Sequence, residues 1–226
     1  KTNKINFFSE NLKITQEAKS YFFEGEIQNK NSSLNNKWFK LLNLDTKNFS
    51  FSNISFDSKN NFSFNIDNGF KMKNLTIDSE IQVNKLEYQK PILLNDYLPD
   101  VNNLIYLKDH KIKTRYKENN FTVEGYGKIK LKKQFDEIKY AIINKEKDFN
   151  LVSNIKLSEL KLNNQEFFKP FFPKLNKIAV LKNQQIQIKY HKDNLSIKGS
   201  GKIKLEKKFD EIDFYISKKK NKLNFD

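Results

Sequence analysis

The 226-residue sequence contains no cysteine, one methionine, one tryptophan and two histidines. Without cysteine the chain has neither a disulfide framework nor thiolate chemistry, which is compatible with any redox compartment. His110 and His191 stand far apart in the sequence, and neither has a second histidine or a cysteine beside it to complete a metal-binding set. We therefore expect both histidines to be surface residues, and we expect the chain to use no metal and no other cofactor.

Long apolar runs are also missing. No stretch approaches the ~18 apolar residues that a membrane-spanning helix needs, and no signal peptide is recognisable. The chain starts at Lys1 without an initiator methionine and stops at Asp226, inside a segment that matches an earlier strand at 149–157. We expect it to be a fragment of a longer protein.

Acidic residues are scarce, since 27 Asp+Glu stand against 42 Lys+Arg, and Arg115 is the only arginine. The resulting net charge of +15 suits an anionic partner such as nucleic acid or anionic lipid. The lysines, however, alternate along the chain with apolar residues instead of clustering. A solvated outer face is therefore the simpler interpretation, and a functional basic surface is the alternative.

A long internal repeat dominates what is present. Residues 125–138 read GYGKIKLKKQFDEI, and residues 199–212 read GSGKIKLEKKFDEI, 74 positions later. The same offset aligns Pro99 with Pro173 and Tyr116 with Tyr190 without a gap. A fixed period of this size is typical of stacked structural units. We predict a diverged unit at 1–73, a second unit at 74–147 and a truncated third unit at 148–226, all within one continuous sheet.

Apolar and polar residues alternate within the repeated stretch. One parity carries Phe121, Val123, Gly125, Gly127, Ile129 and Leu131, whereas the other carries mostly lysine. A period of two predicts a strand with one apolar face. Four glycines lie on the apolar parity, where we expect them to bend the strand or to admit another backbone. These strand-bending glycines are Gly125, Gly127, Gly199 and Gly201.

The pattern along the chain predicts an antiparallel meander of four or five strands per unit. We expect strands at 111–117, 120–131, 136–144 and 148–160, with equivalents at 185–191, 194–205, 210–218 and from 222 onward. Short apolar segments that end near a proline predict one short helix per unit, at 92–99, at 167–173 and, in the first unit, at 38–42. In the first unit we also predict a hairpin closed at 59–61, a turn at 67–69 and a bulge or tight turn between Met72 and Leu75.

Catalytic signals are weak. The pairs Asp136-Glu137 and Asp210-Glu211 recur, but adjacent residues of a strand point to opposite faces, which is poor geometry for acid–base catalysis. The Gly-x-Gly motifs lie inside strands with no following helix, so they do not form a phosphate loop. Phe and Tyr lie mostly on the apolar parity and lysine on the other, so the sheet lacks a basic stacking platform for nucleic acid. We expect neither an enzyme nor a nucleic-acid-binding protein.

A sheet with one apolar face must cover that face, and one short helix per unit is too little to do so. Either the sheet curls until its walls face each other, or a second sheet packs on it, or another molecule fills the trough. Leaving the trough in water would cost ~25 cal/mol for each Å² of apolar surface.

The order of a Phe/Leu-Pro segment, one-faced strands and the pattern I/V-x-G-x-G-x-I-x-L…F-D-x-I resembles the AsmA-like proteins of Gram-negative bacteria, especially the YhdP branch and its relative TamB. The resemblance covers residues 74–226. It implies a mainly β, elongated and curved antiparallel sheet that forms a repeating groove. It further implies a periplasmic location in a parent anchored in the inner membrane, envelope partner proteins, and phospholipid transport between the inner and outer membranes in outer-membrane biogenesis.

In such a groove, phospholipid acyl chains would lie along the apolar residues of the strands. The residues that this resemblance assigns to the lining are Ile112, Tyr116, Phe121, Val123, Ile129, Leu131, Ile138, Tyr140, Ile142, Ile186, Ile188, Tyr190, Leu195, Ile197, Ile203, Leu205, Ile212, Phe214 and Ile216. The alternative is a structural β-sandwich or solenoid repeat for envelope assembly or adhesion. In that case the same residues would form a closed, dry core.

Overall fold

The computed structural model describes residues 5–34, 51–89, 101–102, 104–146, 148–162, 179–205, 207–219 and 222–225. Within these ranges the chain forms strands and turns and contains no helix. The three segments for which we predicted short helices, 38–42, 92–99 and 167–173, lie outside the described residues.

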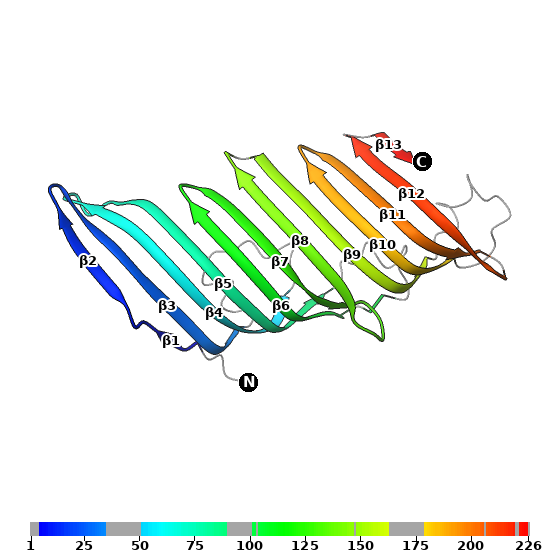
Figure 1. Ribbon diagram of the computed structural model, residues 1–226, viewed down its shortest axis with the longest axis horizontal. Coiled ribbons are helices and arrows are strands. Elements are labelled where there is room, and N and C mark those ends of the chain that lie inside the picture. The colour runs from blue at the N-terminus through cyan, green and yellow to red at the C-terminus, as the bar shows by residue number, and fades with distance from the viewer. Residues whose placement is uncertain are drawn as a thin grey trace.

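The strands form one open, curved antiparallel sheet, which confirms the mainly β prediction (Figure 1). Neighbours follow sequence order from β3 to β13, while β1 and β2 both pair with β3 at one edge. The strands are β1 (Phe7–Phe8), β2 (Leu12–Glu17), β3 (Ser20–Leu34), β4 (Phe51–Asp67), β5 (Met72–Gln89), β6 (Leu104–Lys117), β7 (Asn120–Lys130), β8 (Asp136–Lys145), β9 (Asp148–Leu162), β10 (Ala179–His191), β11 (Asn194–Lys204), β12 (Phe209–Lys219) and β13 (Lys222–Phe225). With strands ~4.8 Å apart, the sheet is about 50 Å wide.

The predicted strands from β7 to β9 and from β11 to β12 agree with the structure to within two residues. Strands β6 and β10 begin several residues earlier than predicted, at Leu104 and Ala179. The hairpin predicted at 59–61 is wrong, because β4 runs unbroken from Phe51 to Asp67. The polar residues in its middle are paired to both neighbouring strands, and so they do not turn the chain.

Tight turns join the strands at one end of the sheet, which we call the turn end. The β6–β7 and β10–β11 hairpins close with two-residue turns whose central residues have φ between 45° and 66°, as in type I′ turns. The Tyr116 hydroxyl donates a hydrogen bond to Asn119 Oδ1 (2.9 Å), and the Tyr190 hydroxyl donates one to Asp193 Oδ1 (3.0 Å). The two turns thus repeat one design 74 residues apart.

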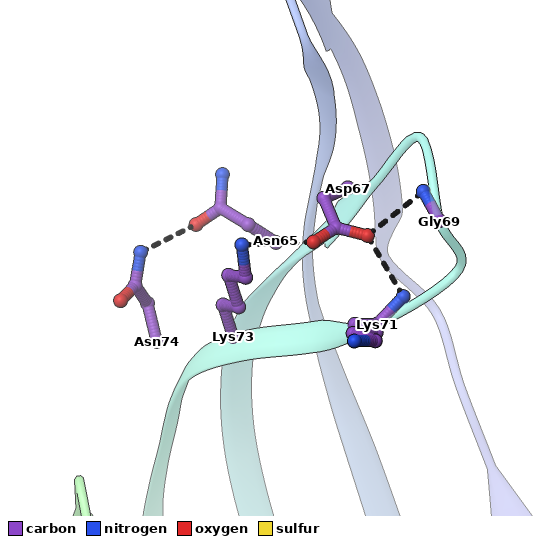
Figure 2. A network of polar contacts seen from close by, with 6 residues as sticks. All are labelled: Asn65, Asp67, Gly69, Lys71, Lys73 and Asn74. Atoms are coloured by element: carbon purple, nitrogen blue, oxygen red, sulfur yellow. Dashed lines mark hydrogen bonds and ion pairs between the residues drawn. The ribbon is translucent and has the colours of Figure 1, made fainter.

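The predicted turn at 67–69 is confirmed between β4 and β5, where the carboxylate of Asp67 organises the backbone (Figure 2). Its Oδ1 accepts hydrogen bonds from the amides of Gly69 (2.9 Å) and Lys71 (3.0 Å), and its Oδ2 lies 2.8 Å from Lys73 Nζ. The contact with Lys73, followed by the amide of Lys71, lowers the pKa of Asp67 below its ordinary value. The ionised side chain therefore holds this turn.

The predicted bulge after Met72 is confirmed as well. Asn74 has a φ of 56°, and the pairing of β5 with β4 slips at this position. Its side-chain amide donates to Asn65 Oδ1 at 3.3 Å (Figure 2). The extra residue restores the apolar residues of β5 to a single face of the sheet.

The two faces of the sheet differ in composition because directly paired residues of adjacent strands point the same way. Ile142 pairs with Val123 on one side and with Leu151 on the other, and we call their side the apolar face. Lys113 pairs with Glu80 and Glu124 on the opposite side, which we call the polar face.

At the end opposite the turns, β6 and β10 each contain a bulge, so we call this the bulged end. Asp109 (φ 54°) and Asn183 (φ 52°) are the extra residues, and the register shifts around both. Each bulge reverses the alternation, so that Leu107 before it and Ile112 after it lie on the apolar face. This reversal explains why the sequence pattern located only the second half of each strand.

A packed core lies on the apolar face at the bulged end. Its buried members are Val101, Ile105, Leu157, Leu160, Ala179, Leu181 and Ile203. Ala179 is fully buried, and Ile203 is 5% exposed. The remainder of the apolar face is more open.

Candidate apolar groove

Rows of apolar side chains cross the strands on the apolar face between β7 and β12. One row consists of Val123, Ile142, Leu151, Tyr190 and Leu195, each paired directly with the next. Antiparallel pairing brings directly opposite Cβ atoms to about 4.5–5.5 Å, close enough for continuous contact. A sheet with this register therefore presents an apolar track that runs across the strands.

A second row lies toward the bulged end and contains Ile138, Ile155, Ile186 and Phe214 together with two glycines. Between the two rows lies a third one, in which Ser153 is the polar exception. The Ser153 hydroxyl donates to the backbone carbonyl of Lys139 at 3.2 Å, which satisfies it without a ligand. The three rows form a broad apolar surface.

The structure places all nineteen predicted lining residues on this surface or against its core. Seventeen lie in strand register on the apolar face, and Leu131 and Leu205 pack against the buried core. Eighteen of them are half-buried, whereas Ile203 is buried inside the core. Ile203 is therefore the predicted lining residue least able to meet a ligand.

Glycines on the apolar face leave room for rings from the neighbouring strand. A Cβ on Gly125 would lie 2.3 Å from the Tyr140 ring, and one on Gly199 would lie 2.1 Å from the Phe214 ring. Both pairs are direct partners in the register, of β7 with β8 and of β11 with β12. The close approach thus comes from a side chain, where the sequence suggested a bend or a second backbone.

The other two glycines leave room for His110 and Gln184, which follow the bulges. A Cβ on either Gly127 or Gly201 would lie 2.4 Å from the side chain above it. His110 Nε2 lies 3.0 Å from the carbonyl of Lys128, and Gln184 Nε2 donates to the equivalent carbonyl of Lys202 at 2.9 Å. The His110 imidazole and the Gln184 amide therefore both contact a backbone carbonyl of the next strand, at equivalent positions of the two units.

The prediction that His110 is a surface residue is wrong, since only 2% of it is exposed. The carbonyl of Lys128 can only accept, so Nε2 carries the proton and Nδ1 is free to accept from the Tyr140 hydroxyl, 3.5 Å away. Burial lowers the pKa of His110, and the backbone contact with Lys128 opposes this in part. His110 is thus a neutral structural residue. His191 is exposed, as predicted.

In β3 to β5 the apolar face contains a group of amides and hydroxyls that the sequence analysis missed. We call Asn29, Ser58, Asn60 and Ser79 the polar island. Asn29 Nδ2 donates to Ser58 Oγ (2.8 Å), and Asn60 Nδ2 donates to the Ile27 carbonyl (2.9 Å) and to Ser58 Oγ (3.0 Å). The signal was present as polar residues on the apolar parity of 56–66, which we interpreted as a turn.

Ion pairs join neighbouring strands on the polar face. They are Lys13–Glu24 (2.9 Å), Lys59–Glu26 (2.8 Å), Lys113–Glu80 (3.0 Å), Arg115–Asp78 (3.4 Å), Lys156–Glu137 (3.1 Å) and Lys202–Glu211 (3.4 Å). The contact between Glu80 and Lys113 lowers the pKa of Glu80 and raises the pKa of Lys113. A hollow of about 890 Å³ also crosses this face from β3 to β9, lined mainly by polar-face residues such as Gln82, Lys111 and Tyr126.

The recurring acidic pair does not form a catalytic dyad. Asp136 is buried on the apolar face, where it accepts hydrogen bonds from the Ser158 amide (2.8 Å) and hydroxyl. Glu137 points the opposite way and pairs with Lys156. Asp136 thus ties the start of β8 to β9.

Among the described residues there is no group of three or more histidine, aspartate or glutamate side chains that could hold a metal ion. Nor does any described segment form a helix long and apolar enough to cross a membrane. The fold and the surface together define a protein with a single open antiparallel sheet, one of whose faces is apolar. In comparisons with known proteins, no family model, no curated protein and no solved structure matches the chain.

Proposed function

We propose that the chain is a lipid-binding segment of a β-groove, in which the apolar face receives the acyl chains of phospholipids. The observation that carries this proposal is the row from Val123 to Leu195, which crosses five strands without a polar interruption while its side chains stay half exposed. Burial of each CH₂ group of an acyl chain contributes ~0.8 kcal/mol. An apolar track of this kind removes much of the cost of moving a lipid through water.

The proposal extends to the organisation of the parent protein. We infer units of about 74 residues, each with one short helix, in a periplasmic sheet whose parent is anchored in the inner membrane. The parent would carry phospholipid between the two membranes without catalysis, together with envelope partner proteins. Contacts that recur at this offset support the units, among them the two glycine–ring pairs and the two bulges.

Photo-crosslinking of the purified chain with phospholipid tests the proposal, and the structure offers a matched pair of positions. Ile142 is half-buried on the apolar face, whereas its neighbour Ile143 is 40% exposed on the polar face. Ile216 and Ser217 form the equivalent pair in β12. A photoreactive residue should give lipid adducts at Ile142 and Ile216 but not at Ile143 or Ser217. Folded variants with no adduct at either isoleucine would contradict the proposal.

A closed structural core is the second candidate, and the buried cluster around Leu157, Ala179 and Ile203 favours it. In that case the apolar face would be dry throughout, because packed interiors leave no room for a tail. Displacement of a fluorescent fatty acid by phospholipid separates the candidates. A groove binds the probe reversibly in the native state, whereas a closed core binds it only as the chain unfolds.

A further inference from the structure

The polar face contains two groups in which lysines cover an aromatic ring, and their positions correspond at the 74-residue offset. In the first cluster, Lys130 Nζ lies 6.0 Å from the Tyr106 ring centroid and 5.7 Å from that of Phe135, and Lys85 Nζ lies 5.7 Å from Tyr106. These are cation–π distances. The rings lie on the face to which the sequence analysis assigned mostly lysine.

In the second cluster, Lys182 Nζ and Lys204 Nζ lie 5.7 Å and 5.8 Å from the Phe209 ring centroid. Phe209 is 39% exposed, and its counterpart Phe135 is 43% exposed. The two phenylalanines stand at the beginnings of β12 and β8, four strands or about 19 Å apart. Both clusters therefore lie at the bulged end of the polar face, along one line.

Two pairs of lysines face each other in this region. The register places Lys108 directly opposite Lys128 and Lys182 directly opposite Lys202, and like charges in such positions destabilise a sheet. Acids lie on the other side of three of these lysines, Glu137 opposite Lys128, Glu159 opposite Lys182 and Glu211 opposite Lys202, and they compensate part of this charge. In the described part of the chain, Lys130, Lys182 and Lys204 form no ion pair, whereas Lys85 of the first cluster lies 2.7 Å from Glu87 Oε1. Lysines on β2, β4 and β6, by contrast, pair with acids on the neighbouring strand. An anionic partner would offset this repulsion.

We propose that the two lysine–aromatic clusters form a docking surface for an anionic phospholipid bilayer, with the lysines on headgroup phosphates and the phenylalanines at the headgroup level. Aromatic rings beside lysine are typical of the membrane–water interface. A stacked nucleobase would have to displace the ammonium groups that already cover the rings, whereas a phosphate adds to them. The surface is separate from the apolar groove and does not require acyl chains to enter it.

Co-sedimentation of the full chain with vesicles tests this surface. We compare phosphatidylcholine vesicles with mixed phosphatidylcholine–phosphatidylglycerol vesicles, because only the latter are anionic. The chain should bind the mixed vesicles and lose affinity as salt increases. A basic residue near an anionic surface is worth about fivefold in affinity, so the triple variant K130Q/K182Q/K204Q should bind roughly 100-fold more weakly.

The matched control is K13Q/K59Q/K113Q, which lowers the net charge by the same three units from +15 but removes lysines that are paired with acids. Its vesicle affinity should fall much less. Replacing both exposed rings in F135S/F209S should weaken binding with the lysines intact. Equal losses in the two lysine variants would overturn the proposal, since net charge alone would then explain binding. Tighter binding to single-stranded RNA than to anionic vesicles would overturn it as well.

Discussion

The apolar face of this sheet differs between its two halves. From β7 to β11 one apolar row is unbroken, from Val123 to Leu195, and glycines admit rings from the next strand. From β3 to β5 the same rows pass through the polar island, where Asn60 and Ser79 face each other. One backbone design therefore supports two surfaces. A continuous apolar row exists in the C-terminal half, whereas the N-terminal half offers hydrogen bonds in its middle and apolar contacts nearer the turn end.

The glycine–ring contacts give the sharpest test of this difference. In the C-terminal half the three atoms nearest to a Cβ on Gly125 all belong to the Tyr140 side chain, but a Cβ on Gly25 meets the Asn11 carbonyl at 2.8 Å as well as the Phe62 ring at 2.9 Å. Overpacking of this kind costs typically 1–3 kcal/mol. We expect Gly125→Ala and Gly25→Ala each to lower the free energy of unfolding by about that amount.

Removal of the neighbouring aromatic ring should restore the stability of Gly125→Ala but not that of Gly25→Ala. Gly125→Ala should cost almost nothing in a Tyr140→Ala background, whereas Gly25→Ala should stay costly beside Phe62→Ala, because the carbonyl of Asn11 remains. Urea unfolding of the two double-mutant cycles measures both couplings. Gly69→Ala, whose Cβ would meet Asp67 Oδ1 at 3.3 Å, is the mild control. Equal recovery of stability in the two double variants would contradict the proposed difference between the two halves.

Exchange of polar and apolar residues between the halves should have the next largest effect. Val123→Asn places an amide without a partner in the unbroken apolar row, which costs about 1–3 kcal/mol, and it should weaken binding of a fluorescent fatty acid. Asn60→Leu gives up contacts to Ile27 and Ser58, at about 0.5–1.5 kcal/mol. It adds apolar surface beside Ile27, although Ser79 and Thr114 still separate it from Val123, and should strengthen binding. Titration with the probe measures both. Thr122→Asn on the polar face is the control, and a weaker probe affinity for Asn60→Leu would contradict the expectation.

His110 and Gln184 allow a smaller comparison, in the response to pH. The folded pKa of His110 is lowered, so its contribution to stability is complete above the ordinary pKa of 6.5 and is lost as the pH falls below that value. The urea midpoint of the wild type should therefore fall between about pH 7.5 and pH 5.5, one unit to each side. His110→Gln, which copies the residue at the equivalent position, should flatten this dependence, and Gln184→His should steepen it. An unchanged profile in His110→Gln would assign the pH effect to other groups.

How much the sequence could predict depended on the regularity of each segment. The alternation in the repeated stretches predicted β7, β8, β11 and β12 and their shared apolar face correctly, because it is strict there. The sequence pattern missed the first halves of β6 and β10, since Asp109 and Asn183 each reverse the alternation. The sequence analysis placed His110 at the surface, because composition does not reveal that a glycine on the next strand leaves a pocket for the ring. Asn60 of the polar island was misread as part of a turn at 59–61, because amides serve in turns and in sheets alike.

Substitutions at the turn end should change the stability of the protein least of all, and Asp67 shows why. Asp67→Ala removes the acceptor for the amides of Gly69 and Lys71 and the partner of Lys73, but all of these groups lie at the solvent-exposed β4–β5 turn (Figure 2). The melting temperature should hardly change, while hydrogen exchange at the Gly69 and Lys71 amides should accelerate. Because the pKa of Asp67 is lowered, protection in the wild type should persist below the ordinary pKa of an aspartate and then be lost. Asn68→Ala leaves the carboxylate in place and serves as the control. Unchanged exchange in Asp67→Ala would mean that the backbone alone holds this turn.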